Sequence, residues 1–465
     1  MNVNRREFVS GAMALSLVGW RRIAAAAGYP DYYAAQFAAV SSRVGKLAKT
    51  CPFGFWFLTD LHMPLNQLHS GDLLAAFVKA TPLGDVICGG DLPEAFRGKF
   101  PSLRAAIDFA TDLYRERWVK PIRAAGGKVY TARGNHDFTV SSGPGGERLT
   151  FGRAETHQLL IGDFTEPGIV TNPVEPEGFY YYFDNPAARV RVVVLDTTGD
   201  YQPKGDAVCS APSGIHMRQF KWLAREALGG TPKGWCVVVV HHIPIAGFVG
   251  DDDDEKTHAH VRQLLEAYQN RRVFENAAGR FDFCKAGGRI LIDITGHRHA
   301  ERQTFQDGIL HVTEPCDVAY PDYLARSQPR KWDLPRKVAG TVAEQTFDAV
   351  QFDIDGGLVH FTRVGGGGNR TMHLRPLTVR AGEKLRLPSS CLGGRVGWLC
   401  YDGDRNTVLP DPKDPKNKYA KLIVCHQNFA TVTADGELSA KAPGPVMAVA
   451  YTPSGNQEIF PVTVR

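Results

Sequence analysis

Three short apolar runs, separated by two helical patterns, constrain the fold of this chain more than any other feature. The runs are FGFWFLTD (53–60), GDVICGGD (84–91) and KVYTARGNHD (128–137). Between them, residues 71–82 and 103–126 carry apolar residues at the spacing of an amphipathic helix. This β-α-β-α-β order is typical of an α/β fold. Each run ends in polar residues that strands disfavour, so we expect loops at those points.

The middle of the chain adds a second set of strands. Two runs joined as a hairpin, FYYYFD and VRVVVLDT, precede the buried runs WCVVVVHHIPI (235–245) and GRILIDITGHRHA (288–300). Helical patterns lie between them, at 217–230 and over most of 258–283. Alternating strands return at 347–364. Two sheets enclosed by helices account for this order, so we predict a four-layer α/β/β/α sandwich.

The composition changes after the glycine-rich stretch VGGGGNR (364–370). Beyond it, short strands alternate with turn residues, which predicts a small all-β sandwich joined through a flexible linkage. The segment ATVTADGELSAKAPGPVMAVAY (430–451) resembles the bacterial immunoglobulin-like modules of surface and secreted proteins. The sequence therefore predicts three parts, which are an export signal (1–27), a mixed α/β domain (28–368) and a β-sandwich domain (369–465).

The first 27 residues resemble a twin-arginine export signal. Arg5 and Arg6 precede an apolar run from Phe8 to Trp20, and the alanines at 24–27 suit a cleavage site. The apolar run is too short to remain as a membrane span. The resemblance implies export of an already folded protein, so we expect a periplasmic or extracellular location. A plain amphipathic N-terminus is the alternative.

Charge and cysteine content argue against several classes of site. The formal net charge of +5 over 465 residues is small and indicates neither nucleic acid nor an anionic membrane as a partner. The nine cysteines are irregularly spaced and include no C-x-x-C, so neither a disulfide scaffold nor a thiolate zinc site is indicated. A disulfide among Cys391, Cys400 and Cys425 stays open.

Residues able to bind metal follow five separate strands. They are Asp60, His62, Asp91, Asn135, His136, His241, His242, His297 and His299. A lone histidine is more often a satisfied surface or core group, and an aspartate after a strand is often a helix N-cap. Five strands that all end in oxygen or imidazole ligands are a poor fit to coincidence, so we expect one shared metal centre.

The spacing of these residues suits two adjacent metal ions. One residue separates Asp60 from His62, so in an extended backbone both side chains would point the same way and grip one ion. The same holds for His297 and His299. Asp91 has two carboxylate oxygens and could bridge two ions. Imidazole suits Zn, Mn, Fe and Ni, and carboxylates add affinity for harder ions. Two ions about 3.5–4 Å apart form a clamp that hydrolyses phosphate esters.

The motifs D-L-H, G-G-D, G-N-H-D, H-H-I-P and G-H-R-H, in that order, resemble those of the calcineurin-like metallophosphoesterase family, over residues 52–363. The resemblance implies one divalent metal held by Asp60, His62, Asp91 and His299. It implies a second divalent metal held by Asp91, Asn135, His242 and His297. His242 is preferred to His241, the second choice, because the family usually places the ligand two residues before the proline.

The resemblance also implies roles in catalysis for two residues that do not bind metal. His136 would face the leaving group and donate a proton or stabilise charge, and Asp137 would hold its ring. Position 94 holds Glu where purple acid phosphatases place a tyrosine that ligates ferric iron, which argues against a purple Fe(III) centre.

The expected function is that of a secreted dinuclear phosphoesterase in which a metal-bridging hydroxide attacks phosphorus. We expect a phosphodiesterase acting on a small-molecule ester of the cyclic-nucleotide or glycerophosphodiester type. A phosphomonoesterase of broad specificity stays open, as does a non-catalytic surface-binding protein with a vestigial site. A two-metal peptidase or amidase lacks support, because no H-E-x-x-H occurs. The β-sandwich could bind a surface or another chain.

Overall fold

A computed structural model describes most of the chain after the predicted export signal. The described residues are 28–63, 69–92, 100–137, 140–142, 148–150, 156–157, 166–198, 215–246, 254–317, 325–328, 337–404, 406–410 and 421–465. The signal at 1–27 and Glu94 lie outside them, so the expectations attached to both stay predictions. Within the described ranges, every helix is too short or too polar to cross a bilayer.

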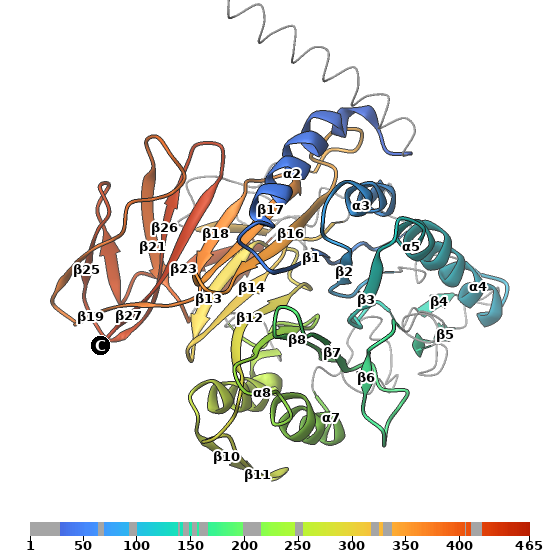
Figure 1. Cartoon of the computed structure of the whole chain (residues 1–465), viewed down its shortest axis with the longest axis horizontal. Coiled ribbons are helices and arrows are strands. Elements are labelled where there is room, and N and C mark those ends of the chain that lie inside the picture. Colours follow the sequence, from blue (N-terminus) through green and yellow to red (C-terminus); the bar gives the residue numbers. More distant parts are fainter. Residues whose placement is uncertain are drawn as a thin grey trace, which may run out of the picture.

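Two large sheets form the centre of the molecule (Figure 1). The first has ten strands, in the spatial order β21 (Gly397–Asp402), β26 (Gly444–Tyr451), β27 (Gln457–Val464), β18 (Arg370–His373), β17 (Leu358–Gly365), β16 (Thr346–Asp353), β1 (Phe53–Leu58), β2 (Asp85–Cys88) and β3 (Lys128–Thr131), with β19 (Leu377–Val379) beside β27. The second has seven, in the order β13 (Arg302–Gln306), β14 (Ile309–Thr313), β12 (Arg289–Thr295), β9 (Cys236–Val240), β8 (Val190–Val194), β7 (Tyr181–Asn185) and β6 (Val170–Thr171).

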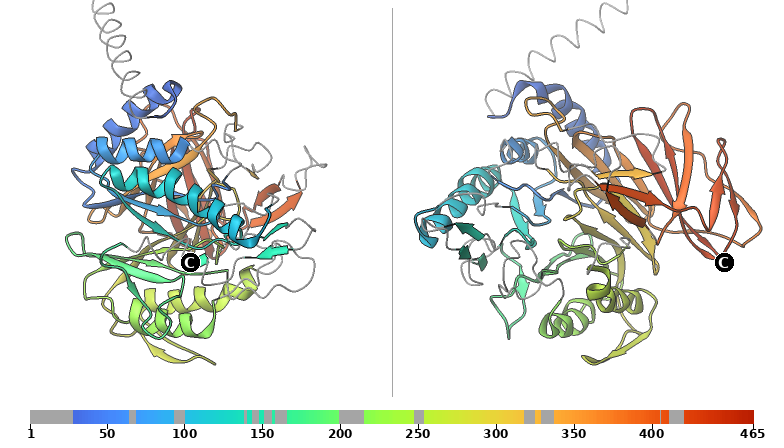
Figure 2. Two further views of the ribbon diagram at one scale, coloured as in Figure 1. Left: turned by 90° about the vertical axis from the view of Figure 1, so that its right-hand side faces the viewer. Right: turned by 180° about the vertical axis from the view of Figure 1, so that it is seen from behind.

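Helices cover the outer face of each sheet (Figure 2). The first sheet is covered by α2 (Ala34–Leu47), α3 (His69–Ala80), α4 (Leu103–Tyr114), the π-helical turn η3 (Arg115–Val119) and α5 (Lys120–Ala124), preceded by η1 (Asp31–Tyr33). The second is covered by α7 (Met217–Trp222), the π-helical turn η5 (Leu223–Leu228) and α8 (Asp254–Gln269). The predicted four-layer α/β/β/α sandwich is confirmed.

Side-chain alternation along the strands explains the layers. Trp56 of β1 stacks on Phe77 of α3, with ring centroids 4.7 Å apart, on the helix side of the first sheet. In the second sheet, Val237 packs in the core beneath α7 and α8, whereas Val238 packs between the two sheets. Strands buried on both faces need apolar residues at nearly every position, which is why β8 and β9 are valine-rich.

Parallel pairing gathers the strand ends that carry the predicted ligands. Strands β1, β2 and β3 are parallel neighbours, with Leu58 paired to Cys88 and Cys88 to Thr131. Strands β8, β9, β12 and β14 are also parallel, with Val240 paired to Ile294. Because the carboxyl ends of parallel strands lie at one edge of a sheet, their following loops converge there.

The C-terminal segment shares the first sheet. Strand β18 pairs with β17 on one side and with β27 on the other, so the predicted boundary at 368/369 falls inside one continuous sheet. A three-stranded sheet of β20 (Lys384–Arg386), β25 (Glu437–Ala440) and β24 (Ala430–Val432) packs on its outer face around a separate apolar core. The β-sandwich is thus present, and one of its two layers is part of the ten-stranded sheet. Whether the two parts are separate domains, and whether the second is immunoglobulin-like, stay predictions.

The glycine-rich stretch at 364–370 is not a flexible linkage, and that expectation is wrong. It forms the tight, largely buried turn between β17 and β18. A Cβ at Gly365 would lie 1.7 Å from the carbonyl oxygen of Gln345, so glycine is needed there for close packing.

One further three-stranded sheet and two strand pairs complete the described elements. Strand β15 (Ala325–Gln328) joins β23 (Lys421–Cys425) and β22 (Asn406–Pro410), and β4 (Val140–Ser142) pairs with β5 (Arg148–Thr150). The hairpin of β10 (Val273–Asn276) and β11 (Gly279–Asp282) replaces the C-terminal part of the helix expected over 258–283. The eight described cysteines are all free thiols, including Cys391, Cys400 and Cys425.

Candidate metal centre

The predicted ligands lie on loops with an unusual backbone. Eight described non-glycine residues have positive φ, and five of them are predicted ligands, namely Asp60 (57°), His62 (46°), Asp91 (55°), His297 (68°) and His299 (50°). The left-handed region is disfavoured for such residues and persists only where the surroundings stabilise it. Asp60 and His62 do lie close together, but the expectation that an extended backbone brings them together is wrong. Both follow the end of β1, and left-handed turns aim them at one point.

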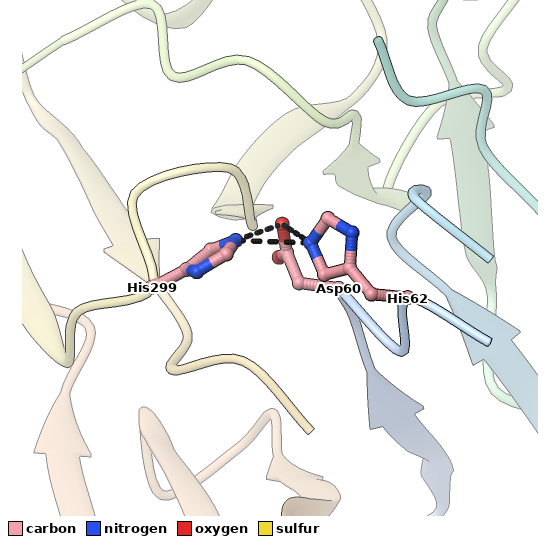
Figure 3. Close-up of side chains that lie close together, drawn as sticks. All are labelled: Asp60, His62 and His299. Carbon is pink, nitrogen blue, oxygen red and sulfur yellow. Dashed lines mark hydrogen bonds and ion pairs between the residues drawn. The ribbon is translucent and has the colours of Figure 1, made fainter. Parts of the chain in front are cut away.

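The first predicted ligand group converges as expected (Figure 3). The Nε2 atom of His299 lies 3.0 Å from Oδ1 of Asp60 and 3.2 Å from Nε2 of His62. The Nε2 atom of His62 lies 3.9 Å from the same Asp60 oxygen. The two loops that follow β1 and β12 thus bring one carboxylate and two imidazoles to a common point.

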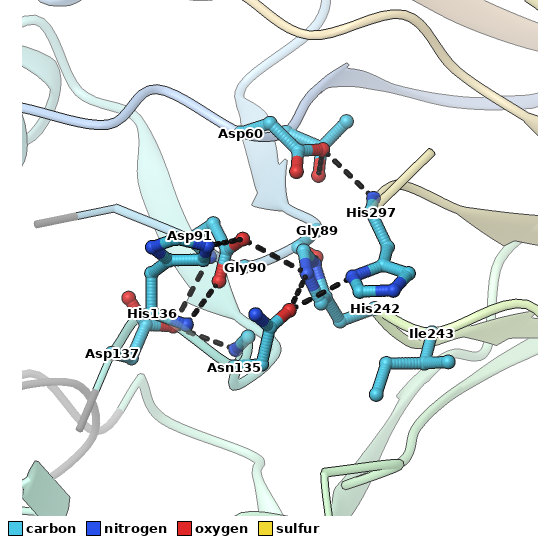
Figure 4. Close-up of polar contacts among 12 residues, drawn as sticks. Asp60, Gly89, Gly90, Asp91, Asn135, His136, Asp137, His242, Ile243 and His297 are labelled. Atoms are coloured by element: carbon cyan, nitrogen blue, oxygen red, sulfur yellow. Dashed lines mark hydrogen bonds and ion pairs between the residues drawn. The ribbon is translucent and has the colours of Figure 1, made fainter. Parts of the chain in front are cut away.

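The second predicted group converges beside it (Figure 4). The Oδ1 atom of Asn135 lies 3.0 Å from Nε2 of His242 and 2.8 Å from Nδ1 of His297. The Nε2 atom of His242 lies 3.1 Å from Oδ2 of Asp91. The loops after β2, β3, β9 and β12 supply these four side chains.

Asp91 lies between the two groups. Its Oδ2 atom is 3.1 Å from His242 of the second group and 3.9 Å from His62 of the first. Its Oδ1 atom accepts a hydrogen bond from the backbone N–H of His136, at 2.7 Å. This position between the groups is the one that a bridging carboxylate needs.

Strand alternation separates His242 from His241. Residues of β9 face the α7/α8 core and the space between the sheets in turn, and the two histidines continue that alternation. The Nε2 atom of His241 lies 2.7 Å from Oδ1 of Asp293, whose other oxygen lies 2.7 Å from Nδ1 of His311. His242 faces the centre, and its Nδ1 atom lies 2.7 Å from the carbonyl oxygen of Gly89, which leaves Nε2 directed at Asp91. Of the two candidates, His242 alone lies in the centre.

His136 lies at the rim of the centre. Its ring is 19% exposed, meets the His62 ring edge-on at 4.7 Å, and places Nε2 3.9 Å from Oδ2 of Asp91. The deep residues Asp60, His62 and Asp91 are buried, so His136 is on the side that solvent reaches. That position suits proton donation to a departing group.

Asp137 holds the backbone of the neighbouring loops. Its carboxylate accepts hydrogen bonds from the N–H groups of Gly134 (2.6 Å), Leu92 (2.8 Å) and Asp91 (3.2 Å). The expected role of Asp137 in holding the ring of His136 stays a prediction. Burial raises the pKa of Asp137 to about 7, reinforced by the Asp91 charge and opposed by the amides. Asp137 therefore ties the loop after β3 to the loop after β2.

The charges of the centre shift pKa values in opposite directions. Burial alone would raise the pKa of Asp60 and of Asp91, but neighbouring imidazoles outweigh burial and hold both below their ordinary range. Burial alone would lower the pKa of His242, yet Asp91 and Asp60 raise it to about 9. Asp60 likewise raises the pKa of His299 well above 6.5 against burial. Ionised carboxylates that draw protons onto their imidazoles mark a site of strongly negative potential, which favours a cation.

Glycines in the motifs allow the loops to approach closely. A Cβ at Gly134 would lie 2.2 Å from Oδ1 of Asp91, and one at Gly296 would lie 2.0 Å from Oγ1 of Thr59. These positions exclude any larger residue without displacing the predicted ligands.

Four supporting residues were missed by sequence reasoning. Thr59 donates a 2.7 Å hydrogen bond to Oδ2 of Asp60, and the Cys316 thiol hydrogen-bonds with His299. Arg133 forms a buried, two-pronged ion pair with Asp196, at 3.1 and 2.5 Å, which joins the end of β3 to the end of β8 across the two sheets. Thr59 and Arg133 adjoin motifs, which was the available signal. Cys316 and Asp196 carry no sequence pattern that indicates their role.

The donors fit a pair of divalent cations. Among the residues that the structure describes, three overlapping groups have ligand atoms within 4.8 Å of one another, and they are Asp60–His62–His299, His62–Asp91–His136 and Asp91–His242–His297. Carboxylate, imidazole and amide oxygen together suit Mn, Zn, Fe or Ni. Asn135, His136, His297 and His299 are partly exposed, so one side of the centre is accessible to a small ligand.

No protein-family model matches the sequence, and no curated protein matches it significantly. Among solved structures, the chain is similar to a dimetal phosphatase from Danio rerio, with 16% identity and a TM-score of 0.44 over 69% of this chain and 98% of that one. It is similar to the phosphopantetheinyl hydrolase of Mycobacterium tuberculosis, with 16% identity and a TM-score of 0.27 over 57% of this chain and 89% of that one. It is also similar to a Vps29 mutant from Entamoeba histolytica, with 10% identity and a TM-score of 0.24 over 67% of this chain and 91% of that one. At these identities and TM-scores, the likeness assigns no function to this chain.

Proposed function

We propose that this protein is a dinuclear metal-dependent phosphoesterase. One observation carries the proposal, namely that two ligand groups share Asp91 and open on one side beside His136. Adjacent carboxylate–imidazole sites with an accessible side are the arrangement used for hydrolysis of phosphate esters.

The proposed ligands are those of the two converging groups. Asp60, His62, Asp91 and His299 would hold one cation, and Asp91, Asn135, His242 and His297 would hold the other. Bound there, the cations would supply positive charge to the phosphoryl oxygens and lower the pKa of water. Thr59 and the Gly89 carbonyl orient Asp60 and His242, so these ligands are preorganised.

His136 is the proposed general acid. Its ring is partly exposed and places Nε2 3.9 Å from Oδ2 of Asp91, and its backbone N–H donates a hydrogen bond to Oδ1 of that carboxylate. A leaving alkoxide needs a proton, and an imidazole is the side chain best suited to supply one near neutral pH. Asp137 is proposed to support this step through the backbone of the loop.

Within this class, we propose a phosphodiester substrate of the cyclic-nucleotide or glycerophosphodiester type. A monoester of broad specificity is the alternative, because both kinds of ester release an alkoxide that His136 could protonate. The test is metal analysis of purified protein, followed by hydrolysis of p-nitrophenyl phosphate and of bis(p-nitrophenyl) phosphate. Faster cleavage of the bis ester supports a diesterase, and faster cleavage of the monoester overturns that choice. Bound metal with neither ester cleaved would contradict the enzymatic function.

Export is a separate proposal, supported by Arg5 and Arg6 ahead of an apolar run. Fractionation of expressing cells tests it, with Arg5→Lys/Arg6→Lys as the matched variant. Export that persists unchanged in this variant would contradict a twin-arginine signal.

A further inference from the structure

The segment after His299 is held by residues that lie far away in the sequence. Glu301, two residues beyond this predicted ligand, is buried. Its Oε1 atom accepts a 3.0 Å hydrogen bond from Nε2 of Gln457, and its Oε2 atom accepts one of 2.8 Å from Arg363. Gln457 begins β27, the last strand of the chain. The loop that carries His299 is therefore attached to the C-terminal segment.

The residues that follow Glu301 are attached to the same segment. The guanidinium of Arg302 lies over the Tyr401 ring, 4.0 Å from its centroid, and donates to the Cys425 thiol at 2.9 Å. The N–H of Phe305 donates to the carbonyl oxygen of Gly403 at 3.0 Å. Strand β13 is thus fixed along its length by β21, β23 and their connections.

Buried charges make the attachment at Glu301 rigid. Arg363 and Arg370 together face three acidic side chains, namely Glu301, Glu314 and Asp348. Burial, together with the nearby Asp348 charge, raises the pKa of Glu314 to about 8, which reduces the negative charge that faces the two guanidinium groups. In a low-dielectric interior such hydrogen-bonded ion pairs have few alternative arrangements, and removing one partner is costly.

We propose that Gln457 is a positioning residue for the metal centre, and that it acts on His299 through Glu301. This inference rests on the proposed metal-dependent function. The C-terminal segment would then help to position a ligand of the metal centre. The site that contains His299 depends on it, whereas the site of Asn135, His242 and His297 depends on it less.

The test is metal titration of full-length Gln457→Met, which keeps side-chain length and removes the donor to Glu301. Groups that orient metal ligands typically change affinity by about 10–100-fold. We expect calorimetric titration with Mn²⁺ to show that the binding affinity of one of the two sites falls by at least about tenfold. Wild-type affinity at both sites would overturn the proposal.

A matched control separates positioning from general destabilisation. Val462 is buried on the opposite face of β27, in the C-terminal core, and does not belong to the Glu301 network. Val462→Ala should lower the melting temperature and leave both Mn²⁺ affinities unchanged. Equal loss of affinity in Val462→Ala and Gln457→Met would overturn the proposal, because it would show that destabilisation alone is sufficient.

Glu301→Gln provides a second route should Gln457→Met fold poorly. It weakens the same contact from the other side, and the double variant completes a cycle. We expect the two substitutions to be non-additive in Mn²⁺ affinity, and additive effects would overturn the proposal. Wild-type protein that binds no metal would instead contradict the proposed function, so the two failures are distinguishable.

Discussion

His241 and His242 are neighbours in the chain, yet their imidazoles lie on opposite faces of the second sheet. His242 meets Asp91 at 3.1 Å, and His241 meets Asp293 at 2.7 Å beneath α7 and α8. The period-two alternation of an extended chain produces this separation. The H-H pair therefore combines a proposed metal ligand with a buried structural residue.

Alanine substitution of each histidine should separate these roles. His242→Ala should lose about half of the bound metal, because it removes a ligand of the second group. His241→Ala should keep the metal and lose roughly 3 kcal/mol of unfolding free energy, because a buried carboxylate loses a partner. Metal analysis and urea unfolding measure the two effects. Metal loss in His241→Ala alone would contradict the assignment.

Asp91→Ala should remove both metals and lower turnover to background, because its carboxylate lies between the two ligand groups. His299→Ala is the matched control, since the ring of His299 contacts Asp60 and His62 of the first group and its loss should spare the second metal. Elemental analysis of both purified variants tests the difference. If Asp91→Ala retained the wild-type metal content, the bridging role would be wrong.

His136→Ala should keep both metals and lower kcat by roughly 10²–10⁴-fold, the usual contribution of a general acid. The loss should be smaller for an ester whose leaving group needs no proton, such as a nitrophenolate. Steady-state kinetics with two leaving groups, together with metal analysis, test this. Because His136 also lies within reach of His62 and Asp91, metal loss in this variant would identify it as a ligand instead.

Glu314→Gln should change how stability depends on pH. Burial raises the folded-state pKa of Glu314 to about 8 from an ordinary 4.5, so between these values the folded protein keeps a proton that the unfolded chain releases. This group therefore makes the wild type less stable as pH rises from 4.5 to about 8. Glutamine stays neutral, so the variant should gain stability relative to wild type at pH 8 compared with pH 5. Parallel melting-temperature curves for the two proteins would contradict this.

Much of the fold could be predicted from local sequence pattern. The strands at 53–58, 236–240 and 289–295 follow from apolar runs of the right length, and the polar residues after them mark the loops of the centre. The ordered motifs predict that residues such as Asp60 and His242 lie in one cluster, where the structure places them, and their role as metal ligands stays a prediction.

Long-range pairing and backbone turns could not be predicted in this way. Periodicity gives no sign that β18 pairs with β27, since the partners are separated by more than 80 residues. The left-handed turn at His62 and the amide contacts of Asp137 depend on the neighbouring loop, which local sequence does not describe. For the same reason the glycine-rich sequence around Gly365 predicts a linker, whereas the structure has a tight turn there.

The left-handed backbone at five positions affects which substitutions evolution should favour there. The positions are Asp60, His62, Asp91, His297 and His299. Each such residue raises the free energy of the fold by roughly 1–3 kcal/mol compared with a relaxed conformation. Substitution by glycine would remove this conformational cost, but it would also remove the side chain that faces the centre. Relatives that have lost the activity should therefore accumulate glycine or asparagine at these five positions first. The residues found there should distinguish active relatives from inactive ones.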